Sequence, residues 1–292
     1  MRGNADMHNL VAPGELGAVL QLLAAEPGAW TPLAGGTEVM VAFSAGRLAA
    51  PKLVSLWGIP DLRTIEVTPQ SISIGATATF LDLRRNATIA AELPLLAKAA
   101  SWIGSIANQG RATLGGNLVN GSPAADSSPA LLAYDAEIEI ISLRGRRRIP
   151  YSDFHTGYKR NVLSPDELLY AIHLPRRFAR HTGYLRKVGT RRAMAIAKVA
   201  LGATALIESG VIGEIRLGAA SLAPFPARLF KTEAALLGQP VTRETIEAAH
   251  RALLDEIKPI SDIRSTAEYR RRVAQNLLDE FLLSLQPIGL QS

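Results

Sequence analysis

The sequence contains no cysteine. Disulfide bonds, thiolate zinc sites, cysteine nucleophiles and cysteine-ligated iron–sulfur clusters are therefore excluded from this polypeptide. Any redox chemistry in which the chain takes part must then depend on a bound organic cofactor.

The sequence also lacks a long apolar run. Its longest apolar stretches, such as residues 199–207, are far shorter than the roughly 20 residues that a membrane span requires. The N-terminus does not combine the basic start, apolar centre and small-residue cleavage site of a secretory signal. We therefore expect a cytoplasmic protein with no membrane span, whose 292 residues are enough for two domains with separate cores.

Aromatic residues are scarce, at 5% of the chain, while the net charge is +6. The arginines lie in short scattered groups, such as residues 144–148 and 270–272, and the aromatic residues do not interleave with them. The stacking surface of a single-strand nucleic-acid binder is therefore missing. Solvated faces, or an acidic partner or ligand, are the preferred interpretation, and we expect no nucleic-acid partner.

Groups typical of catalysis are missing as well. The five histidines do not show metal-ligand spacing, and the sequence has no G-x-S-x-G nucleophile elbow. Adjacent carboxylates such as Asp166 and Glu167 are typical of a turn or helix start rather than of an acid/base couple. We expect neither a catalytic side chain nor a metal ligand in this chain.

The hydrophobic pattern predicts two domains. Up to residue 175 helices and strands alternate. Helices are predicted at 16–23 (the apolar stripe), 38–45, 95–107 and 129–134. Strands are predicted at 30–33, 52–55, 71–74, 137–142, where the chain turns back at 144–145, and 165–174. A basic, turn-like segment at 175–182 follows and predicts a boundary. Beyond it come three strands, at 183–188, 198–207 and 212–217, and then helices at 227–237, at 243–257 and from 267, an order typical of an α+β domain.

Two glycine pairs, 35–36 and 115–116, occur in predicted turns. Glycine permits positive φ and close backbone approach, so that neighbouring N–H groups can point at phosphate oxygens. A helix starting at Glu38 would add its positive dipole end to the first pair. A single glycine pair is more often only a tight turn. Two pairs, with Thr37 and Thr113 beside them, indicate a dinucleotide pyrophosphate site, although neither matches the G-x-G-x-x-G pattern.

An acidic residue, Asp126, follows the second pair. Its carboxylate could accept hydrogen bonds from ribose hydroxyls, as in dinucleotide-binding folds. It could equally cap the helix predicted from about residue 128. The spacing alone leaves both roles open.

The motifs at 33–39 (LAGGTEV), 113–118 (TLGGNL) and 122–132 (SPAADSSPALL) closely resemble the paired flavin motifs of the FAD-binding subunits of molybdenum hydroxylases, the xanthine and carbon monoxide dehydrogenase type. Further similarity lies at residues 157–159, 163–169, 196–199 and 265–271, so the resemblance covers nearly the whole chain. Both glycine motifs at this separation are highly specific.

The resemblance implies an overall α+β fold. An FAD-binding domain of the vanillyl-alcohol-oxidase-like type is expected over residues 1–175, with subdomains at about 1–57 and 58–175. A C-terminal α+β domain of the carbon monoxide dehydrogenase flavoprotein type is expected over 183–290, with a three-stranded antiparallel sheet plus helices.

The resemblance also implies which residues bind FAD. The pyrophosphate would contact two segments, with the residues Leu33, Ala34, Gly35, Gly36, Thr37, Glu38, Val39, Thr113, Gly115, Gly116 and Asn117. The adenosine side would include Ser122 and Asp126, and the adenine region Ile103 and Gly104. Leu169 and Lys187 would lie near the flavin ring, with Ile196 packed on its face.

The family's role would be electron transfer. This chain would pass electrons from the two [2Fe–2S] clusters of a small partner subunit through FAD to an acceptor such as NAD+ or oxygen, while a large molybdopterin subunit oxidises the substrate. A dimer of such heterotrimers is expected. The lack of cysteine excludes the benzoyl-CoA reductase-like relatives, whose flavin subunit carries a cluster of its own.

Two other functions remain as alternatives. One is a flavin-binding protein without redox turnover. The other is a self-contained flavin oxidase, which would need its own substrate pocket and general base, and the sequence offers no base in a convincing setting.

Overall fold

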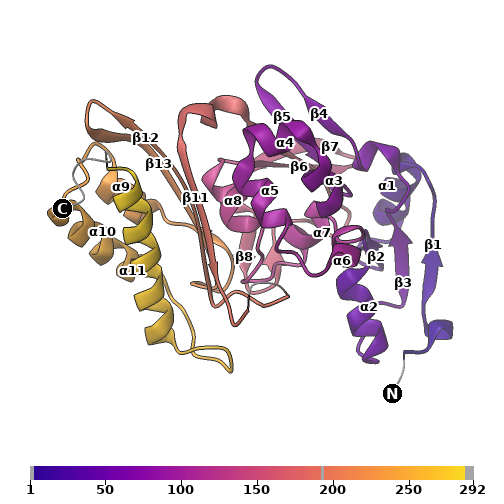
Figure 1. The fold of residues 1–292 in the computed structure, drawn as a ribbon. Coiled ribbons are helices and arrows are strands. Elements are labelled where there is room, and N and C mark those ends of the chain that lie inside the picture. The colour runs from indigo at the N-terminus through magenta and orange to yellow at the C-terminus, as the bar shows by residue number, and fades with distance from the viewer. Residues whose placement is uncertain (1–2, 192–193, 287–292) are drawn as a thin grey trace.

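The computed structural model describes residues 3–191 and 194–286. It contains three units in a row: a small parallel sheet with its helices, a central antiparallel sheet with its helices, and a second antiparallel sheet covered by three helices (Figure 1). The parts of the expected C-terminal domain at residues 192–193 and 287–290 lie outside the described residues.

The N-terminal unit is a three-stranded parallel sheet of order β1-β3-β2. Its elements are the 3-10 helix η1 (Ala5–Met7), β1 (Asn9–Val11), α1 (Leu16–Ala25), β2 (Trp30–Leu33), α2 (Thr37–Ser44) and β3 (Lys52–Ser55). The predicted stripe of α1 packs on the sheet, where Val19 and Leu23 bury against Trp30 and Val54. Since parallel strands share one direction, the chain leaves β2 and β3 at the same edge of the sheet, and the first glycine pair lies there.

The central unit is a five-stranded antiparallel sheet of order β4-β5-β10-β6-β7. Its strands are β4 (Ile65–Val67), β5 (Ser71–Gly75), β6 (Glu137–Ser142), β7 (Gly145–Pro150) and β10 (Leu168–Pro175), and its helices are α3 (Phe80–Arg85), α4 (Ala87–Glu92), α5 (Pro94–Ala100), α6 (Ile106–Gln109), α7 (Leu114–Val119) and α8 (Ser128–Ala133). A small hairpin, β8 (His155–Gly157) with β9 (Arg160–Asn161), and the 3-10 turns η2 (Pro60–Leu62) and η3 (Tyr151–Asp153) complete it. Alternating isoleucines of β5 and β6, together with Ile172 and Leu174 of β10, form the core under the helices.

The predicted helix at 95–107 is wrong in its second half. The chain leaves α5 at Ser101, and α6 starts anew after Ser105, whose side chain caps it by accepting from Asn108 N at 3.2 Å. Gly104 has φ +47°, a left-handed conformation that interrupts a right-handed helix. Gly104 and the Ser105 cap therefore account for the interruption between α5 and α6.

The C-terminal unit is a four-stranded antiparallel sheet of order β11-β12-β13-β14. It comprises β11 (Thr182–Val188), β12 (Val199–Glu208), β13 (Val211–Ala220), β14 (Ala227–Arg228), α9 (Phe230–Leu236), α10 (Arg243–Glu256) and α11 (Ala267–Ser284). The prediction of three strands is corrected to four, because the first residues of the helix predicted at 227–237 form β14 instead. Two residues are too short to show the alternation by which a strand is recognised.

The central and C-terminal units pack closely, because α8 lies on one face of the C-terminal sheet while α10 and α11 cover the other (Figure 1). Gly202 on β12 pairs with Gly218 on β13, and both face α8. A Cβ on Gly202 would stand 2.5 Å from the carbonyl oxygen of Pro129, and one on Gly218 would stand 2.6 Å from the same atom. The helix therefore rests directly on the strand backbones.

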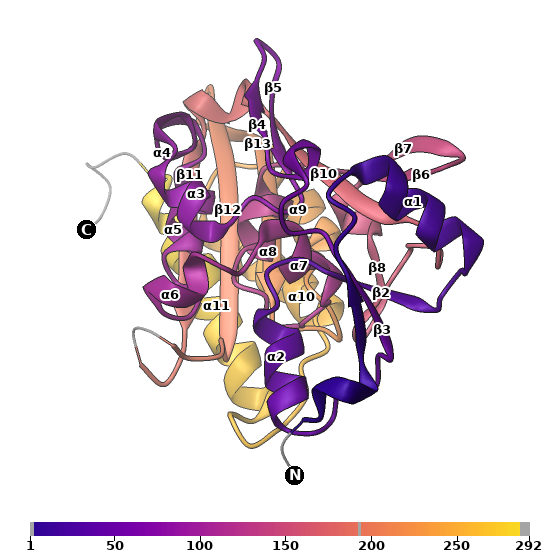
Figure 2. The same ribbon diagram turned by 90° about the vertical axis from the view of Figure 1, so that its right-hand side faces the viewer.

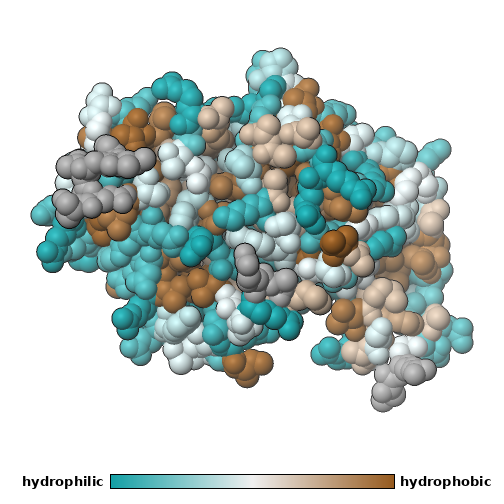
Figure 3. Space-filling view, viewed as in Figure 1, coloured by the Kyte–Doolittle hydropathy of each residue, from teal (hydrophilic) through white to brown (hydrophobic). Residues whose placement is uncertain are grey.

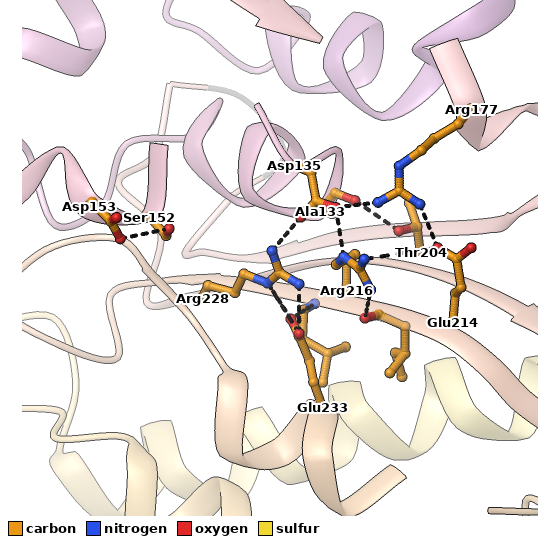
Figure 4. A network of polar contacts seen from close by, with 12 residues as sticks. Ala133, Asp135, Ser152, Asp153, Arg177, Thr204, Glu214, Arg216, Arg228 and Glu233 are labelled. Atoms are coloured by element: carbon orange, nitrogen blue, oxygen red, sulfur yellow. Dashed lines mark hydrogen bonds and ion pairs between the residues drawn. The ribbon is translucent and has the colours of Figure 1, made fainter. Parts of the chain in front are cut away.

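A charged cluster closes the end of this interface (Figure 4). Asp135, which follows α8 with φ +49°, accepts a hydrogen bond from Arg216 Nε at 2.8 Å and forms ion pairs with Arg177 and Arg228. Arg228 in turn donates from Nε to Glu233 at 2.8 Å. One carboxylate of the central unit thus holds three guanidinium groups, two from the C-terminal sheet and one from the connecting segment.

That connecting segment, η4 (Arg176–Arg180), is held at two points. Arg176 donates from both Nε and Nη2 to Glu92 on α4, each at 2.7 Å, and from Nη1 to the carbonyl of Thr68 at 2.7 Å. Arg177 bonds to Asp135 and to Glu214 on β13. Within the described residues, no helix is long and apolar enough to cross a membrane.

Candidate functional site

A cavity of about 570 Å³ lies where the N-terminal unit meets the central unit. Figure 2 shows the start of α2 next to α7 there, at the end of β2. The lining comes from the end of β2 and the first turn of α2, from the segment that leads into α7, and from the segment that leads into β10. Its residues include Gly28, Trp30, Leu33, Ala34, Gly35, Gly36, Thr37, Glu38, Val39, Leu56, Ala76, Thr77, Ile103, Ala112, Thr113, Gly115, Gly116, Asn117, Asn120, Asn161, Glu167 and Leu169.

The first loop presents unused backbone donors to this cavity. Within the described part of the chain, none of the six consecutive amides from Ala34 to Val39 donates a hydrogen bond, and the first bond of α2 runs from Met40 N to Gly36 O at 2.8 Å. Gly36 is the N-cap residue, has φ +78° and provides no side-chain cap. Donors left open at a helix start, next to a left-handed residue, form a concave anion-binding surface. This loop is suited to a phosphate group.

The second loop is different, because its amides are already used. Leu114 N donates to Ala78 O at 3.0 Å, Gly115 N donates to Ala76 O at 2.9 Å, and Gly116 N donates to the hydroxyl of Thr113 at 3.1 Å. The second glycine pair was expected in a turn, which is wrong: it lies in the first turn of α7 with Thr113 as the N-cap. This loop offers side-chain amides and space rather than backbone donors.

Two glycines bring the loops together. A Cβ on Gly35 would stand 1.7 Å from the carbonyl oxygen of Arg111, and one on Gly115 would stand 2.7 Å from Cβ of Ala76. Neither position has room for a side chain, because backbone atoms of Arg111 and Ala76 occupy the space. Each loop is thereby fixed against its neighbour before any ligand binds.

Most of the predicted FAD-binding residues line the cavity. They are Leu33 to Val39 without a gap, Ile103, Thr113, Gly115, Gly116, Asn117 and Leu169. Gly104 is next to Ile103 but is not part of the lining, and Ser122, Asp126, Lys187 and Ile196 also lie outside it. Ile196 is 54% exposed.

Asp126 and Lys187 form a buried ion pair with Nζ and Oδ2 2.6 Å apart. The other carboxylate oxygen, Oδ1, is buried with no partner among the described residues. Burial raises the pKa of Asp126, and the Lys187 ammonium opposes that shift.

The prediction that Asp126 could cap a helix is wrong, because the N-cap of α8 is Ser127, which makes no side-chain cap bond. The resemblance put Asp126 on the adenosine side and Lys187 near the flavin ring, whereas here the two are in contact across the close-packed interface.

Several lining residues were not found from the sequence. Trp30 begins β2, Leu56 directly follows β3, Asn161 belongs to β9, and Glu167 directly precedes β10. The rule that ligands bind at the carboxyl ends of parallel strands could have indicated Leu56. Glu167 accepts from Arg147 Nη2 at 2.8 Å, and this guanidinium lowers the pKa of the carboxyl. Among the described residues, no group of three or more histidine and carboxylate side chains is placed to hold a metal ion.

The geometry described above accompanies a family match over nearly the whole chain. Residues 6–177 match the family model described as the FAD binding domain in molybdopterin dehydrogenase, and residues 184–285 match the carbon monoxide dehydrogenase flavoprotein C-terminal domain. The chain belongs to this family. It is an FAD-binding subunit of the molybdenum hydroxylase type, and the predictions of family, α+β fold class and FAD cofactor are confirmed.

Individual relatives agree with the family match. The chain is 34% identical over 264 residues to the xanthine dehydrogenase FAD-binding subunit of Escherichia coli O157:H7, covering 90% of each. It is 28% identical over 272 residues to the carbon monoxide dehydrogenase medium chain of Hydrogenophaga pseudoflava, covering 93% of this chain and 94% of the other. A solved structure of carbon monoxide dehydrogenase from the same organism, lacking the Mo-pyranopterin moiety, superposes with a TM-score of 0.90 at 27% identity and 96% coverage of each chain. The relatives are oxidoreductase subunits, as predicted for this chain.

Proposed function

We propose that this FAD-binding subunit is the electron-transfer component of a three-part molybdenum hydroxylase. It would receive electrons from the [2Fe–2S] clusters of a small subunit and pass them through FAD to an external acceptor. The single observation that carries the proposal is the row of six unused amides, Ala34 to Val39, facing a cavity of about 570 Å³ in a chain without cysteine. Bound FAD supplies the redox centre that the polypeptide itself does not have.

Each group of residues has a proposed part in holding FAD. The amides of residues 34–39 bind the diphosphate, and Thr113 to Asn117 form the facing wall. Ile103 and Gly104 lie toward the adenine, and Leu169 toward the flavin ring. Lys187, Ile196, Ser122 and Asp126 contribute from the domain interface. The division into domains at 1–175 and 183–290 belongs to the same proposal, and it is supported by the separate sheets of the central and C-terminal units.

The rival oxidase function needs a general base in the cavity. The carboxylates among the lining residues named here are Glu38 and Glu167. Glu167 is a poor base, because the hydrogen bond and charge of Arg147 hold its pKa below the usual value. Glu38 is largely exposed and paired with Lys159. The site is therefore equipped to bind a cofactor rather than to take a proton from a substrate.

Names of relatives support the multi-subunit assembly. Three of them are a medium chain, a medium subunit and one subunit of a dehydrogenase complex. We propose that a small [2Fe–2S] subunit and a large molybdopterin subunit are the partners here, assembled as a dimer of heterotrimers.

Co-expression tests the proposal. The chain alone is expected to bind one non-covalent FAD and to oxidise neither aldehydes nor purines. With both partner subunits it is expected to form a large complex that absorbs as flavin and iron–sulfur and turns over substrate. Substrate oxidation by the lone chain at the rate of the complex would establish the oxidase instead. An assembled complex whose flavin is never reduced by substrate would establish a binding role without redox turnover.

A further inference from the structure

The cavity surrounds its phosphate-binding loop with negative rather than positive side chains. Among the lining residues that the structure describes, the charged ones are two carboxylates, Glu38 and Glu167. Glu167 is balanced by Arg147 at 2.8 Å and Arg144 at 3.7 Å. Glu38 belongs to the first turn of α2, beside the unused amides. A diphosphate bound there would meet an uncompensated like charge unless a cation joined it.

Lys159 is the cation in reach of that turn. It lies 121 residues away in sequence, in the tight turn between β8 and β9, and its Nζ is 3.4 Å from Oε1 of Glu38. Both side chains are accessible, with Lys159 45% and Glu38 61% exposed. The pair joins the central unit to the N-terminal unit at the rim of the cavity. Glu38 of α2 lines the cavity, and so does Asn161, which belongs to the same hairpin as Lys159.

The backbone holds Lys159 in an uncommon conformation. Its φ is +51°, a left-handed value that glycine or asparagine adopts more readily than lysine. The hairpin is held in place on two sides: a Cβ on Gly121 would stand 3.1 Å from Cα of Lys159, and Asn161 Nδ2 donates to Val119 O at 3.3 Å. A strained non-glycine residue that the surrounding structure keeps in place is a common feature of ligand-binding sites.

We propose that Lys159 is a ligand of the FAD diphosphate. In the free protein its ammonium pairs with Glu38, and on binding it turns to the phosphate oxygens that the amides of residues 34–39 hold. The long flexible side chain allows this shift, and Glu38 then remains as a competing anion. The inference rests on the proposed position of the diphosphate at the first loop.

FAD titration of the apoprotein tests the proposal. Lys159→Met is expected to weaken FAD binding about tenfold, the scale of a hydrogen bond to a charged group at a partly exposed site. It should also reduce the salt dependence of binding, and Lys159→Arg should keep most of the affinity. The matched control is Arg160→Met, which removes the same charge one residue away. Because successive side chains of a strand point to opposite faces and Asn161 lines the cavity, Arg160 points elsewhere, and its loss should leave FAD binding unchanged.

The Glu38→Gln background separates contact from simple charge balance. Glu38→Gln alone is expected to tighten FAD binding about threefold, because the competing anion is gone. If Lys159 touches the diphosphate, Lys159→Met still weakens FAD about tenfold in this background. If Lys159 serves only to neutralise Glu38, the same substitution is silent there, and the proposal is overturned. Urea unfolding of each apoprotein shows that the fold is intact, and a wild-type chain that binds no FAD would overturn the proposed function itself rather than this ligand.

Discussion

The central unit meets its two neighbours through interfaces that differ in how many polar groups they leave open. Against the C-terminal unit, α8 rests on Gly202 and Gly218 without room for a methyl group, and Asp135 joins three arginines. The interface with the N-terminal unit is also packed in part, since Gly35 lies against Arg111, but it contains a cavity with six unused amides and the exposed ion pair of Lys159 with Glu38.

The difference shows where the free energy of folding and of binding should reside. The contacts of α8 and Asp135 at the first interface are made within the chain, so they stabilise the apoprotein. The second interface leaves backbone donors without a partner among the described residues, so a bound cofactor would complete it and should raise the stability of the folded state. Substitutions in the two interfaces should therefore separate into changes of unfolding free energy and changes of FAD affinity.

The largest expected effect is at Gly202. Gly202→Val places side-chain carbons against the carbonyl of Pro129 and should lower the unfolding free energy of the apoprotein by about 3 kcal/mol or more, measured by urea denaturation. The control Gly213→Val lies on the same sheet, where a Cβ meets only the movable carboxylate of Glu208. Equal stability of both variants would show that the α8 interface is less tightly packed than the geometry indicates.

Asp135→Asn should lower the apoprotein's unfolding free energy by about 2 kcal/mol, because a half-buried carboxylate is lost from among three guanidinium groups. Asparagine accepts the positive φ of this position, so backbone strain stays unchanged. Asp255→Asn, in an exposed pair with Lys231, is the control and should leave stability nearly unchanged, because solvent screens an exposed ion pair. FAD affinity should remain unaltered in both variants. A loss of FAD with Asp135→Asn would show that the two interfaces do not divide into one that sets stability and one that sets FAD affinity.

Asp126→Ala should loosen FAD by about 1–3 kcal/mol, the scale for a hydrogen bond to a charged group. The same change leaves Lys187 buried without a partner, so the double variant Asp126→Ala with Lys187→Met is needed. FAD titration of the single and the double variant then measures whether the affinity lost with Asp126 returns when Lys187 is also replaced. Full recovery of affinity in the double variant would assign Asp126 to the domain interface alone, and continued weakness would assign the Asp126–Lys187 pair to the cofactor.

The smallest effect is expected at Gly36. Gly36→Ala should destabilise the apoprotein by about 1 kcal/mol through its positive φ, since a Cβ meets nothing closer than 3.7 Å. FAD affinity should fall about tenfold, because Gly36 lies in the row of unused amides that we propose to bind the diphosphate. Gly238→Ala carries similar strain at φ +75° in open space and should leave FAD unchanged. Equal FAD affinity for the two variants would remove Gly36 from the site.

Local features of the fold could be predicted from the sequence. The stripe of α1, the hairpin β6–β7 and three of the four C-terminal strands follow from hydrophobic period, and the first glycine pair follows from residue type. Features set by distant partners could not be predicted in this way. The first amides of α7 donate to Ala76 and Ala78 in the segment that follows β5, so the donor-rich loop can be told from the donor-poor one only in three dimensions. The partners of Asp126 and Glu38 lie 61 and 121 residues away, beyond any local pattern.

The contacts of the connecting segment η4 limit how the units can move relative to one another. Because Arg176 fastens it to Glu92 and Thr68, and Arg177 to Asp135 and Glu214, it has no freedom to act as a hinge. The central and C-terminal units should then move as one rigid body. The N-terminal unit, by contrast, leads into the rest of the chain only through residues 56–64 after β3. Leu56, Ile59 and Leu62 of this connection are buried in one cluster with Ile141 and Leu168 of the central sheet. The rate of cofactor exchange is therefore expected to respond to substitutions in this connection and not to those in η4.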